Sequence, residues 1–220
     1  MIKRTYPQSR LRRTRAKGYL RDLVAENHLS TNDLIQPIFV ADQSEMKVDI
    51  PSMPGIFRHN LESLYAETEE LIAQGIKSVA IFPAIDSDKK DSQGSHAFDD
   101  NNIVCSALRG LAERFPEVIK IADVALDPYT DHGHDGILLD SKVDNDQTLK
   151  LLQNQALLLV QSGADVLAPS DMMDGRVRLI RDILESNGFV DTVILSYAAK
   201  YACLLYTSDA ADEGLGVDLG

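Results

Sequence analysis

The sequence predicts an α/β fold in which a parallel sheet is covered by helices. Two observations lead to this prediction. From residue 33 onward, short apolar segments rich in β-favouring residues alternate with longer segments of helical periodicity. The strand-like segments are apolar on both faces, which is typical of strands buried in a parallel sheet. A chain of 220 residues is long enough for one sizeable domain, or for one domain with an arm.

Five strands and four intervening helices are expected. The strands cover 33–40, 77–84, 118–126, 164–170 and 192–200, and the helices cover 61–75, 101–115, 146–163 and 172–188. Each helix has either an apolar stripe or recognisable ends. Gly75 and Gly163 supply stop signals, Pro116 ends the second helix, and Asp146 is the N-cap candidate of the third.

An open doubly wound sheet and a (β/α) barrel both have this alternation. No G-x-G-x-x-G fingerprint follows the first strand, which weakens a dinucleotide-binding reading. Polar residues at the strand exits favour the barrel: Asp123 and Asp127 at the third strand, Ser170 and Asp171 at the fourth, and Lys200 at the fifth. In barrels, catalytic groups lie at the carboxyl ends of several strands around one mouth.

The charge is uneven along the chain. The net charge is −12, yet residues 1–21 contain eight basic residues and no acid. We expect a basic arm, residues 1–32, that docks on the acidic surface of a neighbouring copy rather than on nucleic acid or a membrane. Two cysteines in unrelated contexts, and an N-terminus without a signal-peptide core, favour a cytoplasmic protein.

Lys200 is the residue with the clearest chemical potential. It lies in ILSYAAKYA, where the nearest preceding acid is Asp191. An apolar setting disfavours the charged amine and lowers its pKa, and a neutral amine can form a Schiff base with a ketone. The alternative is a lysine at a strand end that simply reaches solvent, which is the commoner fate of lysines.

Two further segments concentrate polar residues. ADVALDPYTDHGHDG, residues 122–136, contains aspartates and two histidines that would suit a hard cation, or would serve as turn residues of a solvated loop. PSDMMDGRVRLI, residues 169–180, places Ser170 and Asp171 just before a helix, where helix capping would also explain them.

Several motifs, in this order and spacing, resemble the 5-aminolevulinate dehydratase (porphobilinogen synthase) family. They are ADVALDPYTDHGHDG, APSDMMDGRV and SYAAKYA, supported by RLRRTRA, DLIQPIFV, MPGIFRHNLESL and SVAIFPAI. The resemblance covers residues from about 4 to 202.

The resemblance implies a fold and a reaction. The fold is a (β/α)8 TIM barrel, here with about five units, whose N-terminal arm wraps a neighbouring subunit in a homo-octamer. The reaction condenses two molecules of 5-aminolevulinate to porphobilinogen with loss of water, in tetrapyrrole (haem) biosynthesis. Lys200 matches one of the family's two Schiff-base lysines, Asp123 an active-site aspartate, and Ser170 and Asp171 residues near the substrates.

The metal requirement implied by the resemblance is the zinc-independent one. Zinc-dependent members have three cysteines in the 122–136 loop, and here these positions are Ala125, Asp127 and Asp135. Zinc is therefore not expected there. Magnesium is expected, in some members with a monovalent cation, and Asp127 and Asp135 are its candidate ligands. No organic cofactor is expected.

The resemblance ends near residue 202. We expect a partial barrel over 33–202 and a segment outside the family, CLLYTSDAADEGLGVDLG, over 203–220. The family's second lysine would then be missing, the outer strands, first and fifth, would be open edges, and the chain as written would be inactive. Two alternatives stay open: another Schiff-base lyase of the aldolase type, and a non-catalytic half-barrel subunit.

Overall fold

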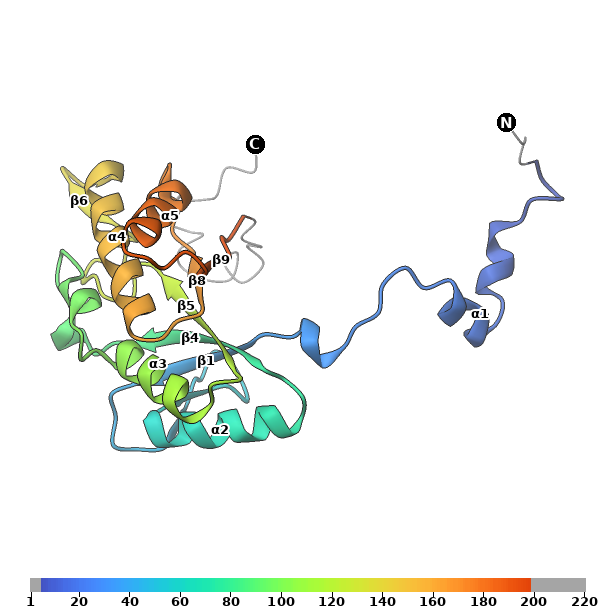
Figure 1. Cartoon of the computed structure of the whole chain (residues 1–220), viewed down its shortest axis with the longest axis horizontal. Coiled ribbons are helices and arrows are strands. Elements are labelled where there is room, and N and C mark those ends of the chain that lie inside the picture. Colours follow the sequence, from blue (N-terminus) through green and yellow to red (C-terminus); the bar gives the residue numbers. More distant parts are fainter. Residues whose placement is uncertain (1–4, 199–220) are drawn as a thin grey trace.

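A computed structural model describes residues 5–198. Its main sheet has seven strands in the order β2-β3-β1-β4-β5-β8-β9. Figure 1 labels β1, β4, β5, β8 and β9 of this sheet. Five of them are parallel neighbours in chain order: β1 (Gln36–Ala41), β4 (Ser78–Ala84), β5 (Ile119–Val124), β8 (Val166–Pro169) and β9 (Val193–Ile194). These are the five predicted strands, so the α/β fold with a mostly parallel sheet is confirmed. The strands described here do not close into a barrel.

The prediction that the first strand is an open edge is wrong. The short strand β3 (Phe57–His59) pairs in parallel with β1, and β2 (Lys47–Asp49) pairs antiparallel with β3. Strands of three residues give too short a pattern to be predicted from alternation. On the other side of the sheet, β9 is the outermost strand, as expected. A separate hairpin joins β6 (Ile137–Leu139) to β7 (Lys142–Asp144).

The predicted helices are present with shorter bounds. They are α2 (Leu61–Ala73), α3 (Ile103–Arg114), α4 (Asn145–Gln161) and α5 (Arg176–Ser186). Asp144, rather than Asp146, caps α4, because its carboxylate accepts the backbone N–H of Gln147 at 2.8 Å. The described residues also contain four short 3-10 helices. Two precede β1, namely η1 (Leu11–Arg15) and η2 (Thr31–Asp33), and two lie between β4 and α3, namely η3 (Ser87–Lys89) and η4 (Ser95–Phe98).

The two faces of the sheet differ in what covers them. One face packs its apolar side chains, such as Ile81 and Val124, against α2–α5 in a large buried cluster that includes Leu108 and Leu152. The alternate residues of the same strands point to the other face and form a small cluster of Ala80, Ile121, Val166 and Ala168 with Phe82. The helices therefore cover the first face, and the second face, which carries the small cluster, is called the inner face below.

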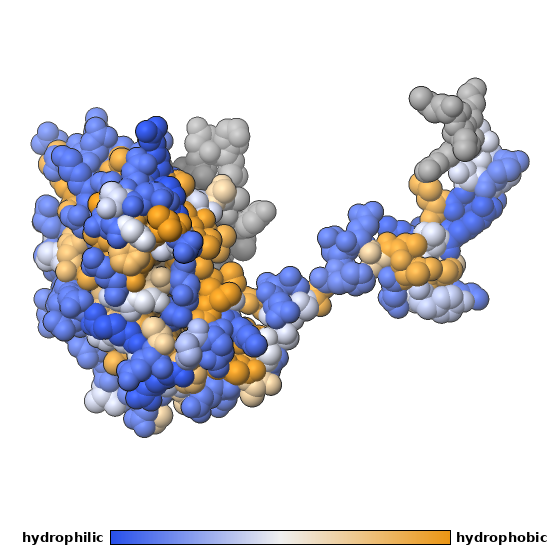
Figure 2. Space-filling view, viewed as in Figure 1, coloured by the Kyte–Doolittle hydropathy of each residue, from blue (hydrophilic) through white to orange (hydrophobic). Residues whose placement is uncertain are grey.

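The N-terminal segment extends away from the body (Figure 1). Its elements η1, η2 and α1 (Gly18–Leu23) contain no buried residue. Leucines are exposed along it, including Leu11 at 78% and Leu29 at 80%. Figure 2 shows apolar residues gathered on the side of the body from which this segment leaves. In residues 5–198, no helix is both long enough and apolar enough to span a membrane.

Candidate active site

The exits of β5 and β8 lie side by side. Asp123 of β5 is paired with Ala168 of β8, and the backbone N–H of Ser170 donates to the carbonyl of Val124 at 3.3 Å. Parallel strands end at the same edge of the sheet, which is why residues far apart in sequence meet here. The structure thus brings together the predicted residues Asp123, Ser170 and Asp171 around one edge.

Asp123 belongs to the inner face. Ile121, two residues earlier in the same strand, is in the inner cluster, and side chains of a strand alternate between faces. Asp123 is half-buried, and its carboxylate is close enough to affect two phenols. Burial raises the pKa of Tyr197, and the charge of Asp123 raises it further. The pKa of the fully buried Tyr129 is raised by burial and by several neighbours, Asp123 among them.

Asp171 is a buried carboxylate with defined partners. Its residue exposure is 1%, and its Oδ1 accepts the backbone N–H of Met173 at 2.8 Å. Its Oδ2 lies 3.5 Å from Nε of Arg176. The reading of Ser170 and Asp171 as caps of the predicted 172–188 helix is wrong, because α5 begins at Arg176 and Gly175 is its N-cap.

The chain after β9 continues along the exit of β8. The backbone N–H of Leu195 donates to Leu167 at 2.8 Å, and that of Tyr197 donates to Pro169 at 3.1 Å. The inner face has an open, mostly apolar hollow of about 450 Å³. Residues that line it include Ile35, Phe82, Ile121, Ala168 and Leu195–Ala198. The segment leads in sequence to Lys200, which lies outside the described residues.

The loop between β5 and β6 holds the three positions considered for metal. Oδ1 of Asp135 accepts the backbone N–H of Leu126 at 2.7 Å, which closes the loop on itself. Ala125 is buried and its carbonyl accepts Nε2 of Gln155 at 2.9 Å, while Asp127 is exposed. Among residues 5–198 no three carboxylate, histidine or cysteine side chains are arranged to hold an ion. The described loop therefore does not supply a complete protein-ligand set for a metal.

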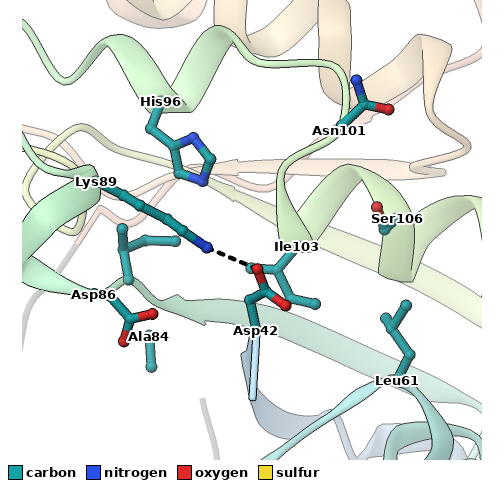
Figure 3. Close-up of a pocket in the computed structure, with 10 residues that line it drawn as sticks. Asp42, Leu61, Ala84, Asp86, Lys89, His96, Asn101, Ile103 and Ser106 are labelled. Carbon is teal, nitrogen blue, oxygen red and sulfur yellow. Dashed lines mark hydrogen bonds and ion pairs between the residues drawn. The ribbon is translucent and has the colours of Figure 1, made fainter. Parts of the chain in front are cut away.

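A second, smaller hollow of about 140 Å³ lies at the exits of β1 and β4 (Figure 3). Sequence reasoning did not single it out. In the close-up, the amine of Lys89 points at the carboxylate of Asp42, with Nζ and Oδ2 2.7 Å apart. The hydrogen bond to Asp42 raises the pKa of Lys89. A lysine held protonated in this way is a poor nucleophile.

A family model described as delta-aminolevulinic acid dehydratase matches residues 8–212. The chain belongs to the delta-aminolevulinic acid dehydratase family. The match places the chain in this family rather than in a family of aldolase-type lyases. It also runs past residue 202, into the segment that the sequence prediction placed outside the family.

Relatives of known name cover most of this chain. Delta-aminolevulinic acid dehydratase of Chlamydia pneumoniae is 46% identical over 198 residues, which is 90% of this chain and 60% of that protein. The same enzyme of Bradyrhizobium diazoefficiens is 44% identical over 197 residues, covering 90% of this chain and 56% of that protein. The chain thus spans about 60% of the length of these two relatives.

A solved structure of the family has the same arrangement. Delta-aminolevulinic acid dehydratase (porphobilinogen synthase) of Toxoplasma gondii ME49, in complex with the reaction product porphobilinogen, superimposes with a TM-score of 0.86 at 43% identity. The match covers 93% of this chain and 59% of that one. Two residues of the site, Arg176 and Tyr197, were not predicted, although both lie inside the motifs that carried the resemblance.

Proposed function

We propose that this chain carries one half of a porphobilinogen synthase site, in which Lys200 forms a Schiff base with 5-aminolevulinate. The observation that carries the proposal is the meeting of Asp123, Ser170 and Asp171 at adjacent strand exits, beside the segment that leads to Lys200. The relative solved with porphobilinogen, at 43% identity, supports the choice of substrate.

The first chemical step is imine formation. The neutral amine of Lys200 attacks the ketone carbon of 5-aminolevulinate, a C–N bond forms, and the carbonyl oxygen leaves as water after two proton transfers. The imine then withdraws electrons from the adjacent carbon, which eases loss of a proton to give an enamine that can form the new carbon–carbon bond. Asp123 is the proposed proton carrier, since it is half-buried at the same edge of the sheet.

The fold proposed for the whole enzyme is the TIM barrel, with this chain contributing about five of its eight units over 33–202. Two features support it: the parallel strands follow one another in chain order, and the helices cover one face while the inner face has only the small cluster of Ala80, Ile121, Val166 and Ala168. An open doubly wound sheet would reverse its strand order and would need helices on both faces.

Magnesium and oligomer formation are parts of the same proposal. Magnesium is often held by one or two carboxylates together with water, so Asp127 and Asp135 would be its ligands in the loop. The basic arm 1–32 is proposed to dock on another copy in a homo-octamer, because its apolar residues have no cover within the described chain. We also infer a cytoplasmic location.

Borohydride trapping tests the function directly. The full chain is incubated with 5-aminolevulinate and borohydride, digested, and mapped by mass spectrometry. We expect a reduced adduct on Lys200, none on Lys89, and none with a sugar-phosphate ketone. Lys200→Arg should abolish the adduct, and Lys89→Arg should leave it unchanged. An adduct spread equally over both lysines, or absent from Lys200, would overturn the proposal.

A further inference from the structure

We propose that Arg176 is a positioning residue that ties the segment after β9, Ser196 and Tyr197, to the buried carboxylate Asp171, and that imine formation at Lys200 depends on this tie. The inference rests on the proposed function and deepens it. The tie is made of side-chain contacts within residues 171–197, and the segment it holds is the one that leads in sequence to Lys200.

The guanidinium of Arg176 makes an ion pair through Nε and hydrogen bonds through Nη1 and Nη2. Nε lies 3.5 Å from Oδ2 of Asp171, and Nη1 donates to the carbonyl of Met173 at 3.2 Å. Nη2 donates to the carbonyl of Tyr197 at 3.3 Å and to Oγ of Ser196 at 3.4 Å. The planar fork of arginine can hold these acceptors together, whereas the single nitrogen of a lysine cannot reach both sides.

The position of Arg176 in its helix gives no other reason for a cation. Arg176 is the first residue of α5, and its N-cap Gly175 has a φ of 84° and makes no side-chain cap. The positive end of the helix dipole disfavours a cation there by about 0.3–1 kcal/mol. The contacts to Asp171 and to Tyr197 offset this cost, so they account for the residue better than helix stability does.

Arg181, one helical turn and more away, is a natural comparison. Its Nη1 donates to the carbonyl of Thr192 at 2.7 Å and its Nη2 to that of Phe189 at 2.8 Å. It also pairs with Glu185 of its own helix at 3.0 Å. Arg181 therefore holds the chain that enters β9, and Arg176 holds the chain that leaves it. Of these two arginines, Arg176 is the one that contacts a predicted site residue, Asp171.

The test compares Arg176→Gln with Arg181→Gln and with Arg178→Gln, a change at an exposed arginine of the same helix. Each variant is first checked for a native circular-dichroism spectrum. Imine trapping with 5-aminolevulinate is then measured over a range of concentrations. We expect Arg176→Gln to lower the maximal trapping rate at Lys200 by about 10- to 100-fold, since small misplacements of a reacting group cost this much. The half-saturating concentration of 5-aminolevulinate should change little in Arg176→Gln. The maximal trapping rates of Arg181→Gln and Arg178→Gln should stay within about twofold of the wild-type rate.

A second readout does not depend on 5-aminolevulinate. Formaldehyde and borohydride methylate neutral amines, and the rate at Lys200 is divided by the rate at the exposed Lys150 of the same molecule. We expect this ratio to fall in Arg176→Gln only, because a lysine amine that leaves an apolar setting for water is protonated for more of the time. Arg176→Lys should give an intermediate ratio, because it keeps the charge and loses the fork.

The outcomes separate the two proposals. A wild-type chain without a 5-aminolevulinate adduct, combined with a lowered methylation ratio in Arg176→Gln, would overturn the proposed function and leave the positioning role standing. An unchanged or raised ratio in Arg176→Gln would overturn the positioning role. An equal fall in Arg181→Gln would overturn it too, because loss of any arginine tie of α5 would then have the same effect.

Discussion

Asp135 is predicted to stabilise the loop after β5 whether or not it binds a metal. Its Oδ1 accepts the backbone N–H of Leu126 at 2.7 Å, and Leu126 is fully buried. Asp135→Ala removes this acceptor, and a buried N–H that loses its partner costs about 1–3 kcal/mol. Asp135→Asn keeps an oxygen in place and loses only the charge assistance, which is worth about 1 kcal/mol.

Urea unfolding in buffer containing a chelator measures this effect without any metal contribution. With a slope of about 1–3 kcal/mol per molar urea, Asp135→Ala should lower the midpoint by roughly 1 M and Asp135→Asn by about half of that. Asp131→Ala, at an exposed aspartate of the same loop, is the matched control and should stay within about 0.5 kcal/mol of the wild type. Equal losses for Asp135→Ala and Asp131→Ala would refute the reasoning. A loss that appears only with magnesium present would instead make Asp135 a metal ligand.

Three further predictions concern other parts of the molecule. Burial lowers the pKa of His59 below its ordinary value of 6.5, so this side chain binds a proton more readily in the unfolded chain, and the free energy of unfolding falls as the pH drops through about 6.5. His59→Asn should make the urea midpoint less dependent on pH between about pH 7.5 and 5.5, and an unchanged pH dependence would contradict this. Gly136→Ala should destabilise the chain in thermal unfolding by about 1–3 kcal/mol more than Gly133→Ala. Both glycines have a positive φ, but of the two only Gly136 has side chains within 2.7 Å of where a Cβ would lie. Equal losses of stability in the two variants would contradict this prediction. Deletion of residues 1–32 should lower the oligomeric state seen by light scattering and leave the circular-dichroism spectrum of the body unchanged, since the described arm elements bury no residue; an unchanged oligomer would show that the arm does not hold it together.

The sequence was sufficient for the parallel core of the fold. Each of the five strands lies in a short, mostly apolar segment, and each helix has either an apolar stripe or recognisable ends, so most of these elements could be predicted from local pattern. Shorter elements were missed for a physical reason. β3 has only three residues and is defined by its pairing with β1, a long-range contact without a local pattern. The start of α5 was misplaced because Asp171 caps a turn that precedes the helix.

The candidate site was predictable in part. Asp123, Ser170 and Asp171 stood out because polar residues at the ends of buried strands are unusual, and the structure brings them to one edge. Arg176 did not stand out, because an arginine in an amphipathic helix looks like an ordinary solvated residue. Its role depends on what the first turn of α5 faces, which only the folded chain reveals. Lys200 stays a prediction, since it lies outside the described residues.

The consecutive order of β1, β4, β5, β8 and β9 has a consequence for how the chain acquires its structure. Each new parallel strand pairs with the strand made just before it, so no pairing within this run has to wait for a distant part of the chain. The entropy cost of loop closure is then divided into small steps, one for each crossover between neighbouring strands. We expect the body to assemble progressively on the ribosome, with β1 and β4 joined before β8 has been synthesised.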